Sequence, residues 1–194
     1  MSMENQVKKI CQSGYFHICN INGIRKYLSK EHTEKLIHAF VSSRLDNCNS
    51  LLYGISKNLL HRLQLIQNAA ARTVCLIPKY DHISPSLRML HWLPIEQRII
   101  YKVCWLTWKA RHGYSPQYIR DLLINHDTHS RGLRSANKNL LVIPKSSTKT
   151  FGDRSFSVAA PYLWNKLPMQ LKSCNEMNRF KSLLKTHLFN EAFN

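Results

Sequence analysis

Acidic residues are scarce in this chain of 194 residues, where 11 Asp and Glu stand against 28 Lys and Arg. The five aspartates are isolated, because none has another acidic residue within two positions. Two-metal phosphoryl transfer needs carboxylates that converge on a pair of cations. Isolated aspartates instead favour helix caps, turns and ion pairs. A metal-dependent nuclease stays open as an alternative only if the aspartates converge in three dimensions.

Close cysteine pairs are also absent, which bears on metal binding. The six cysteines form no Cys-x-x-Cys motif, and the His-x-x-His of His126 and His129 has no second arm. His17 and Cys19 lie near Cys11, again without the paired arms typical of structural zinc sites. The six glycines form no phosphate-binding loop and no Gly-x-Ser-x-Gly elbow. We therefore predict no cofactor, no metal site and no nucleophilic triad.

Long apolar runs are missing, so we predict no membrane partner. The opening residues MSMENQVKK lack the apolar stretch of a signal peptide. We expect a protein that is not secreted, resides in the nucleus or cytoplasm, and keeps its thiols reduced.

Positive charge is abundant. The formal net charge is +17, and the segment 128–190 carries 11 basic residues against two acids, Asp153 and Glu176. Neutralisation of phosphates by Lys and Arg drives sequence-independent binding, so the charge predicts a nucleic-acid partner. The alternative is a basic surface that is solvated and has no specific partner.

Apolar residues recur at helical spacing, and we predict a mainly α fold with at most short β-strands. The opening segment 4–28 contains Gly14 and Gly23, and we expect these two glycines to interrupt the segment. Further helices are predicted at residues 30–45, 57–77, 84–90, 95–112 and 116–124, with a last one ending near Phe193. Prolines become more frequent after the helix predicted at 57–77. We therefore predict a helical unit at 1–77 and a mixed, mostly helical, basic region at 78–194.

Local signals predict where several elements begin and end. Ser29 and Ser56 are predicted N-caps, and Ser173 with Glu176 forms a capping-box pattern for the last helix. Gly113 is expected to end the helix that Pro94 begins. Between these helices we predict a polar loop at 125–139, a short strand at 140–143 and an irregular segment at 151–168. The spacing of the second helix places four residues on one face: Ile37, Phe40, Val41 and Arg44.

Three groups of residues are candidate nucleic-acid contacts. The first shares one face of the helix 95–112, where an indole lies between cations: Arg98, Lys102, Trp105 and Lys109, followed by His112. The second is a polar stripe on the helix 57–77: His61, Gln64, Asn68 and Arg72. The third is a basic loop region: Arg131, Arg134, Lys138, Lys145 and Lys149. Trp105 at the edge of the core and inert solvated stripes remain the alternatives, while Trp92 and Trp108 are predicted core residues.

Four tracts carry a resemblance to a known family. They are, in order along the chain, AFVSSRLDNCNSLLYG at 39–54, LQLIQNAAART at 63–73, YDHISPSLRMLHWLPIEQR at 80–98 and TKTFGDRSFSVAAPYLWNKLP at 148–168. In this order they resemble the C-terminal end of the reverse transcriptases of non-LTR retrotransposons of the CR1, L2 and Rex type. Departures from the family pattern are mild: Asn47 replaces the usual Tyr, Thr73 the usual Leu, and Ser84 a common Thr.

The resemblance implies that residues 1–77 correspond to the end of the polymerase thumb, a helical unit that grips the template–primer duplex. The remainder resembles the region after the thumb, which implies binding of RNA, RNA–DNA hybrid or DNA. The chain has no Asp-Asp pair, so the polymerase signature of the palm is missing. We therefore expect a piece of such an enzyme without polymerase activity, with the absent palm as a further partner. A relic or protein-interaction module whose charge is unused is the alternative.

Overall fold

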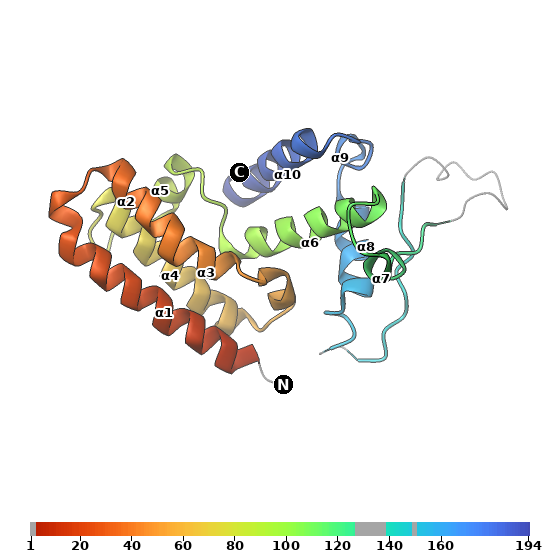
Figure 1. The fold of residues 1–194 in the computed structure, drawn as a ribbon, viewed down its shortest axis with the longest axis horizontal. Coiled ribbons are helices and arrows are strands. Elements are labelled where there is room, and N and C mark those ends of the chain that lie inside the picture. Colours follow the sequence, from red (N-terminus) through yellow and green to blue (C-terminus); the bar gives the residue numbers. More distant parts are fainter. Residues whose placement is uncertain (1–2, 127–138, 149–150) are drawn as a thin grey trace. The chain divides into compact units, whose positions relative to one another are not determined.

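A computed structural model describes residues 3–126, 139–148 and 151–194 of the chain (Figure 1). Over these residues the fold is mainly α and contains no sheet, which confirms the predicted class. No helix within them is long and apolar enough to cross a membrane. The chain divides into two compact units, residues 1–99 with 189–194, and residues 100–188. This division lies inside a helix, whereas the sequence suggested a boundary near Ile77.

The first unit is built from helical elements alone over its described residues. They are α1 (Met3–Ile24), η1 (Arg25–Tyr27), α2 (Lys30–Ile37), η2 (His38–Ser42), α3 (Ser43–Asp46), η3 (Asn49–Leu52), α4 (Lys57–Cys75), α5 (Ser84–Met89), the start of α6 (Ile95–Arg111) and the end of α10 (Met177–Phe193). Of the predicted caps, the Ser29 side chain accepts from the His32 amide and the Ser56 side chain from the Leu59 amide. Both predicted N-caps are confirmed.

Helix α1 packs along α4, and Gly14 is the point of close approach (Figure 1). A Cβ atom added at Gly14 would lie 2.8 Å from Cγ2 of the fully buried Ile66. The prediction that Gly14 and Gly23 interrupt the opening segment is wrong, because both lie inside α1. Gly14 instead allows two helix backbones to come together, an advantage that offsets its weak helix propensity.

The helix predicted at 30–45 forms, but it contains a π-helical turn, η2. Ile37, Val41 and Leu45 are buried at steps of four residues, while Phe40 is 45% exposed and Arg44 is exposed. The predicted face that joined Phe40 and Arg44 to Ile37 and Val41 is therefore wrong. A π turn adds a residue to the helix, which rotates the following side chains relative to a regular α-helix.

The second unit holds the rest of the helices. They are the remainder of α6, α7 (Gln117–Arg120), α8 (Phe156–Lys166), α9 (Met169–Lys172) and most of α10 (Met177–Phe193). Gly113, at φ +79°, follows the end of α6 as predicted. Trp108, Trp164 and Phe180 are fully buried here, while Trp92 is buried in the first unit, so Trp92 and Trp108 are core residues as predicted.

Most of the segment 151–168, predicted to be irregular, is helix α8, with Pro161 inside it. A proline within a helix costs about 3 kcal/mol because it removes a hydrogen bond. Burial of Ala159, Ala160, Leu163 and Trp164 offsets this cost. The irregular structure predicted from Gly152 and Pro161 is therefore wrong for residues 156–166, because the buried apolar residues around Pro161 stabilise a helix.

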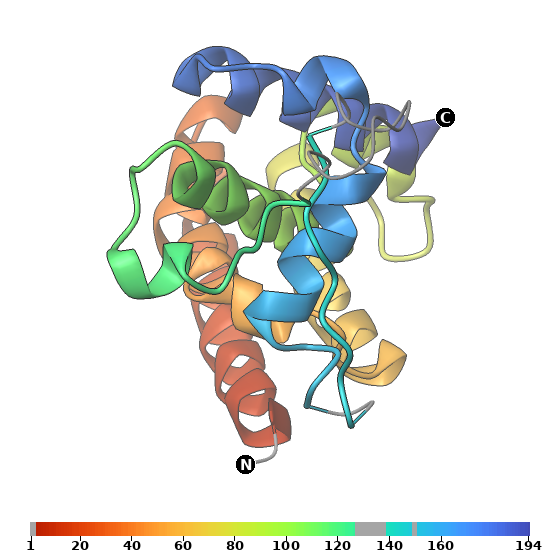
Figure 2. The same cartoon turned by 90° about the vertical axis from the view of Figure 1, so that its right-hand side faces the viewer.

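The residues 139–148 run alongside α8 without forming the predicted strand (Figure 2). Their only β feature is an isolated antiparallel bridge between Asn125 and Leu141. The side chain of Asn165 on α8 accepts from the Leu141 amide at 2.9 Å and donates to the Leu141 carbonyl at 2.8 Å. A side chain thus satisfies the backbone groups that a neighbouring strand would otherwise pair.

The predicted capping box at the last helix is also wrong. Helix α10 begins at Met177, and Ser173 is the C-cap of α9. Ser173 therefore ends the short helix α9 and lies too far before Met177 to cap α10.

Candidate nucleic-acid interface

A tryptophan with two lysines above it is the most distinctive basic feature of the second unit. Trp105 is half-buried, and its ring stacks on Trp108 with centroids 5.4 Å apart and planes 13° apart. The ammonium groups of Lys109 and Lys181 lie 5.9 Å and 4.5 Å from the Trp105 centroid. We call Trp105, Lys109 and Lys181 the indole cluster. Among the described residues, no carboxylate lies within ion-pair distance of either lysine.

The sequence missed Lys181 because it comes from α10, some 70 residues away from the predicted face on α6. Helical spacing relates residues of one helix only. Lys102, one turn before Trp105, is half-buried on α6. His112 takes a structural position, since its ring stacks on Trp108 with centroids 4.0 Å apart and its Nδ1 lies 2.9 Å from the Trp108 carbonyl oxygen.

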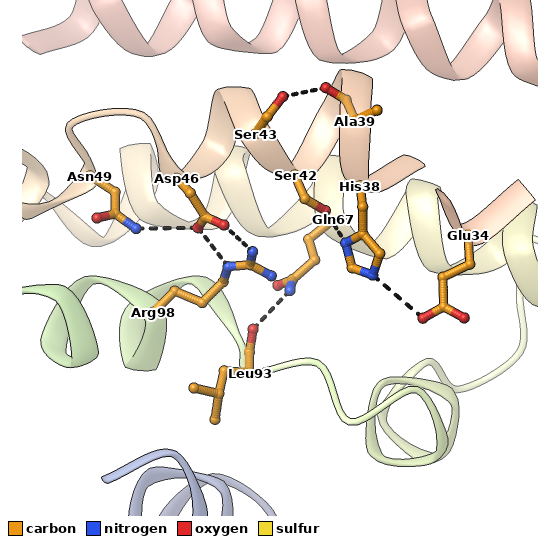
Figure 3. A network of polar contacts seen from close by, with 10 residues as sticks. All are labelled: Glu34, His38, Ala39, Ser42, Ser43, Asp46, Asn49, Gln67, Leu93 and Arg98. Atoms are coloured by element: carbon orange, nitrogen blue, oxygen red, sulfur yellow. Dashed lines mark hydrogen bonds and ion pairs between the residues drawn. The ribbon is translucent and has the colours of Figure 1, made fainter. Parts of the chain in front are cut away.

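Arg98, the first member of the predicted face, belongs to the first unit and is engaged there. Its Nε donates to Asp46 Oδ1 at 2.8 Å, and its Nη2 donates to Asp46 Oδ2 (Figure 3). The side chain of Arg98 is only 16% exposed. Asn49 donates to the same Asp46 carboxylate at 3.3 Å. A guanidinium held in this bidentate geometry has few donors left for a phosphate.

The polar stripe on α4 is largely engaged within the first unit. Gln64 accepts from the amide of Ile95 at 2.9 Å, satisfying one of the unpaired donors at the start of α6, and donates to Asn68 at 2.8 Å. Arg72 donates to the carbonyl oxygens of Pro78 and Asp81. His61 is exposed. Three of the four residues in this stripe thus have hydrogen-bond partners in the fold.

The third group lies mostly outside the described residues. The members outside the described residues are Arg131, Arg134, Lys138 and Lys149. Lys145 is described and is exposed.

A ladder of polar side chains follows the helix through η2 (Figure 3). Glu34 Oε1 lies 3.5 Å from His38 Nε2, and His38 Nδ1 lies 3.3 Å from Ser42 Oγ. The indole N–H of Trp92 donates to the same Glu34 oxygen at 3.2 Å. Ser42 is only 6% exposed, so its hydroxyl is withdrawn from any substrate. The ladder connects α2, η2 and the Trp92 segment, and it does not present an accessible nucleophile.

Burial shifts the pKa of two cysteine thiols upward. It raises the pKa of Cys11, against a smaller lowering by Arg62, and it raises the pKa of Cys75. All six cysteines are free thiols. No group of three or more His, Cys, Asp or Glu side chains gathers around a common point in the part of the chain that the structure describes. The described carboxylates thus supply no preformed site for two cations.

No protein-family model, curated protein or solved structure matches this chain.

Proposed function

We propose that this chain binds RNA, RNA–DNA hybrid or DNA with little sequence preference, as the thumb and post-thumb segment of a non-LTR retrotransposon reverse transcriptase without its palm. The observation that carries the proposal is the indole cluster in a chain of net charge +17. Both ammonium groups lie near the Trp105 ring, and no carboxylate of the described residues lies within ion-pair distance of them, so both can contact phosphates. The four sequence tracts supply the link to the retrotransposon family.

The indole cluster suits a single strand better than a base-specific reader. An aromatic ring offers a stacking surface for any base, while cations beside it hold the backbone. Trp105 is half-buried, so part of its surface remains accessible while the rest packs on Trp108. Lys109 and Lys181 then contact the phosphates, and Lys102 extends the positive surface along α6.

Binding of a fluorescent oligonucleotide is expected to weaken steeply with salt. If about six phosphates are contacted, the slope of log K against log salt is near −5 for duplex DNA. Lys109→Gln and Lys181→Gln should each flatten this slope by about one unit, evenly across sequences. Lys57→Gln, an exposed lysine of the first unit, is the matched control. Salt-independent affinity, or no binding at about 50 mM salt, contradicts the proposal.

Primer extension should fail with any template, nucleotide or divalent metal. A polymerase needs converging metal-binding carboxylates, and the chain lacks an Asp-Asp pair. The assay uses highly purified full-length chain, with an active reverse transcriptase as the positive control. Template-dependent incorporation that co-purifies with the chain would contradict this prediction.

A further inference from the structure

The first unit has a groove of its own, which includes none of the residues of the indole cluster. Its walls are one face of α1 and one face of the η2–α3 segment, which run side by side (Figure 1). The groove encloses about 530 Å³, within the usual range of ligand-binding sites. Its lining residues are Gln6, Lys9, Ile10, Ser13, Ala39, Phe40, Ser43, Arg44 and Asn47.

The groove lining is cationic and rich in hydrogen-bond donors. Lys9 and Arg44 come from opposite walls, and both are exposed. None of the lining residues is acidic. No carboxylate in the described chain lies within ion-pair distance of Lys9 or Arg44. Gln6, Ser13 and Asn47 add amide and hydroxyl donors that suit phosphate oxygens. The charge therefore favours a ligand with a phosphate group.

An aromatic ring stands in the same groove. Phe40 is 45% exposed and belongs to the π turn η2. The ring of His17 stacks on Phe40 with centroids 5.3 Å apart and planes 25° apart, which supports one side of the ring. Ile37 and Val41 are buried in the core, while Phe40 between them is exposed and lines the groove. An exposed phenyl ring beside two cations is an arrangement that stacks a base and holds its phosphates.

We propose that this groove binds a short stretch of single-stranded nucleic acid. Lys9 and Arg44 contact consecutive phosphates, and Phe40 stacks on a base. The groove extends about 10 Å along α1, from Gln6 to Ser13, so it holds a short segment rather than a duplex. The proposal deepens the nucleic-acid function proposed above, on which it rests, and adds a site in the first unit that is separate from the indole cluster.

The test uses the full-length chain and a fluorescein-labelled oligo(U) strand. The double variant Lys9→Gln, Arg44→Gln should flatten the slope of log K against log salt by about 1.4, the value for two contacts on a single strand. Phe40→Leu keeps an apolar side chain but removes the ring, and should weaken binding about tenfold with an unchanged slope. Phe40→Trp should restore binding. Lys26→Gln, which removes an exposed lysine outside the groove, should leave the slope close to that of the wild-type chain.

Photocrosslinking locates the contact directly. An oligo(U) strand that carries 5-iodouridine should crosslink to the peptide that contains Phe40, and the crosslink should disappear in the Lys9→Gln, Arg44→Gln variant. Because the side chains of Lys9, Phe40 and Arg44 are exposed, each variant should fold, and circular dichroism checks this.

The outcomes separate this proposal from the broader one. If oligo(U) does not bind the wild-type chain in a salt-dependent way, the nucleic-acid function itself fails. If binding is normal but the groove variants bind like wild type and crosslinks map only to the second unit, the groove proposal alone is overturned. If poly-glutamate competes as well as unlabelled oligo(U), and its binding is also lost in the double variant, the groove binds acidic peptides instead.

Discussion

Replacing Trp108 by alanine should lower the free energy of unfolding by about 3–5 kcal/mol, the usual cost of removing a buried tryptophan. Trp108 is fully buried and stacks with Trp105 and Phe180, whose centroids lie 5.4 Å and 5.5 Å from its own. Its indole N–H donates to the Cys174 carbonyl oxygen at 2.8 Å. The substitution therefore creates a cavity and leaves a buried carbonyl without its donor.

Urea unfolding followed by circular dichroism measures this loss, and Trp105→Ala is the matched control. Trp105 lies one turn earlier on α6 but is only half-buried, so its loss should be smaller, about 1–2 kcal/mol. Trp105→Ala should instead weaken binding of single strands by about 1–3 kcal/mol through lost stacking. Equal stability losses for the two variants, with unchanged affinity for Trp105→Ala, would place Trp105 in the core and remove it from the interface.

Replacing Asp46 by alanine should destabilise the first unit by about 1–3 kcal/mol, less than the loss for a fully buried pair because Asp46 is 43% exposed. The change leaves the guanidinium of Arg98, which is 16% exposed, without its anion. It also removes the acceptor of the Asn49 side chain. The double variant Asp46→Ala, Arg98→Leu should recover part of the loss, because both charges are then absent.

A double-mutant cycle over Asp46 and Arg98 measures the coupling by urea unfolding. The same variants test whether Arg98 contacts nucleic acid. Because the guanidinium is already paired with Asp46, Arg98→Leu should leave the salt slope of binding unchanged. A coupling energy near zero, together with a slope flattened by about one unit, would return Arg98 to the interface.

Local signals in the sequence were enough to predict the mainly α class and several helix ends. Ser29, Ser56 and Gly113 act through hydrogen bonds and backbone angles within a few residues of themselves, which is why they could be read directly. The features that the sequence did not predict depend on contacts between residues that are distant in sequence. Gly14 is explained only by Ile66 on another helix, and Leu141 only by Asn165.

The candidate sites show the same limit. Charge and helical spacing indicated Trp105 with Lys109, but the third member, Lys181, lies on α10. Arg98 shares the predicted face by spacing, yet Asp46, 52 residues earlier, engages it. Phe40, the aromatic residue of the groove, lies in a π turn, and a pattern search with a fixed helical period cannot detect the extra residue of such a turn.

The π turn also determines how this segment tolerates changes in length. The π turn contains one residue more than the same turn of a regular α-helix. We therefore expect that deletion of one residue within His38–Ser42 converts the turn to regular α-helix. The same deletion in the middle of α1 rotates every later side chain by about 100° and exposes the buried row. A single-residue deletion should therefore be tolerated at η2 and should destabilise the fold near Gly14.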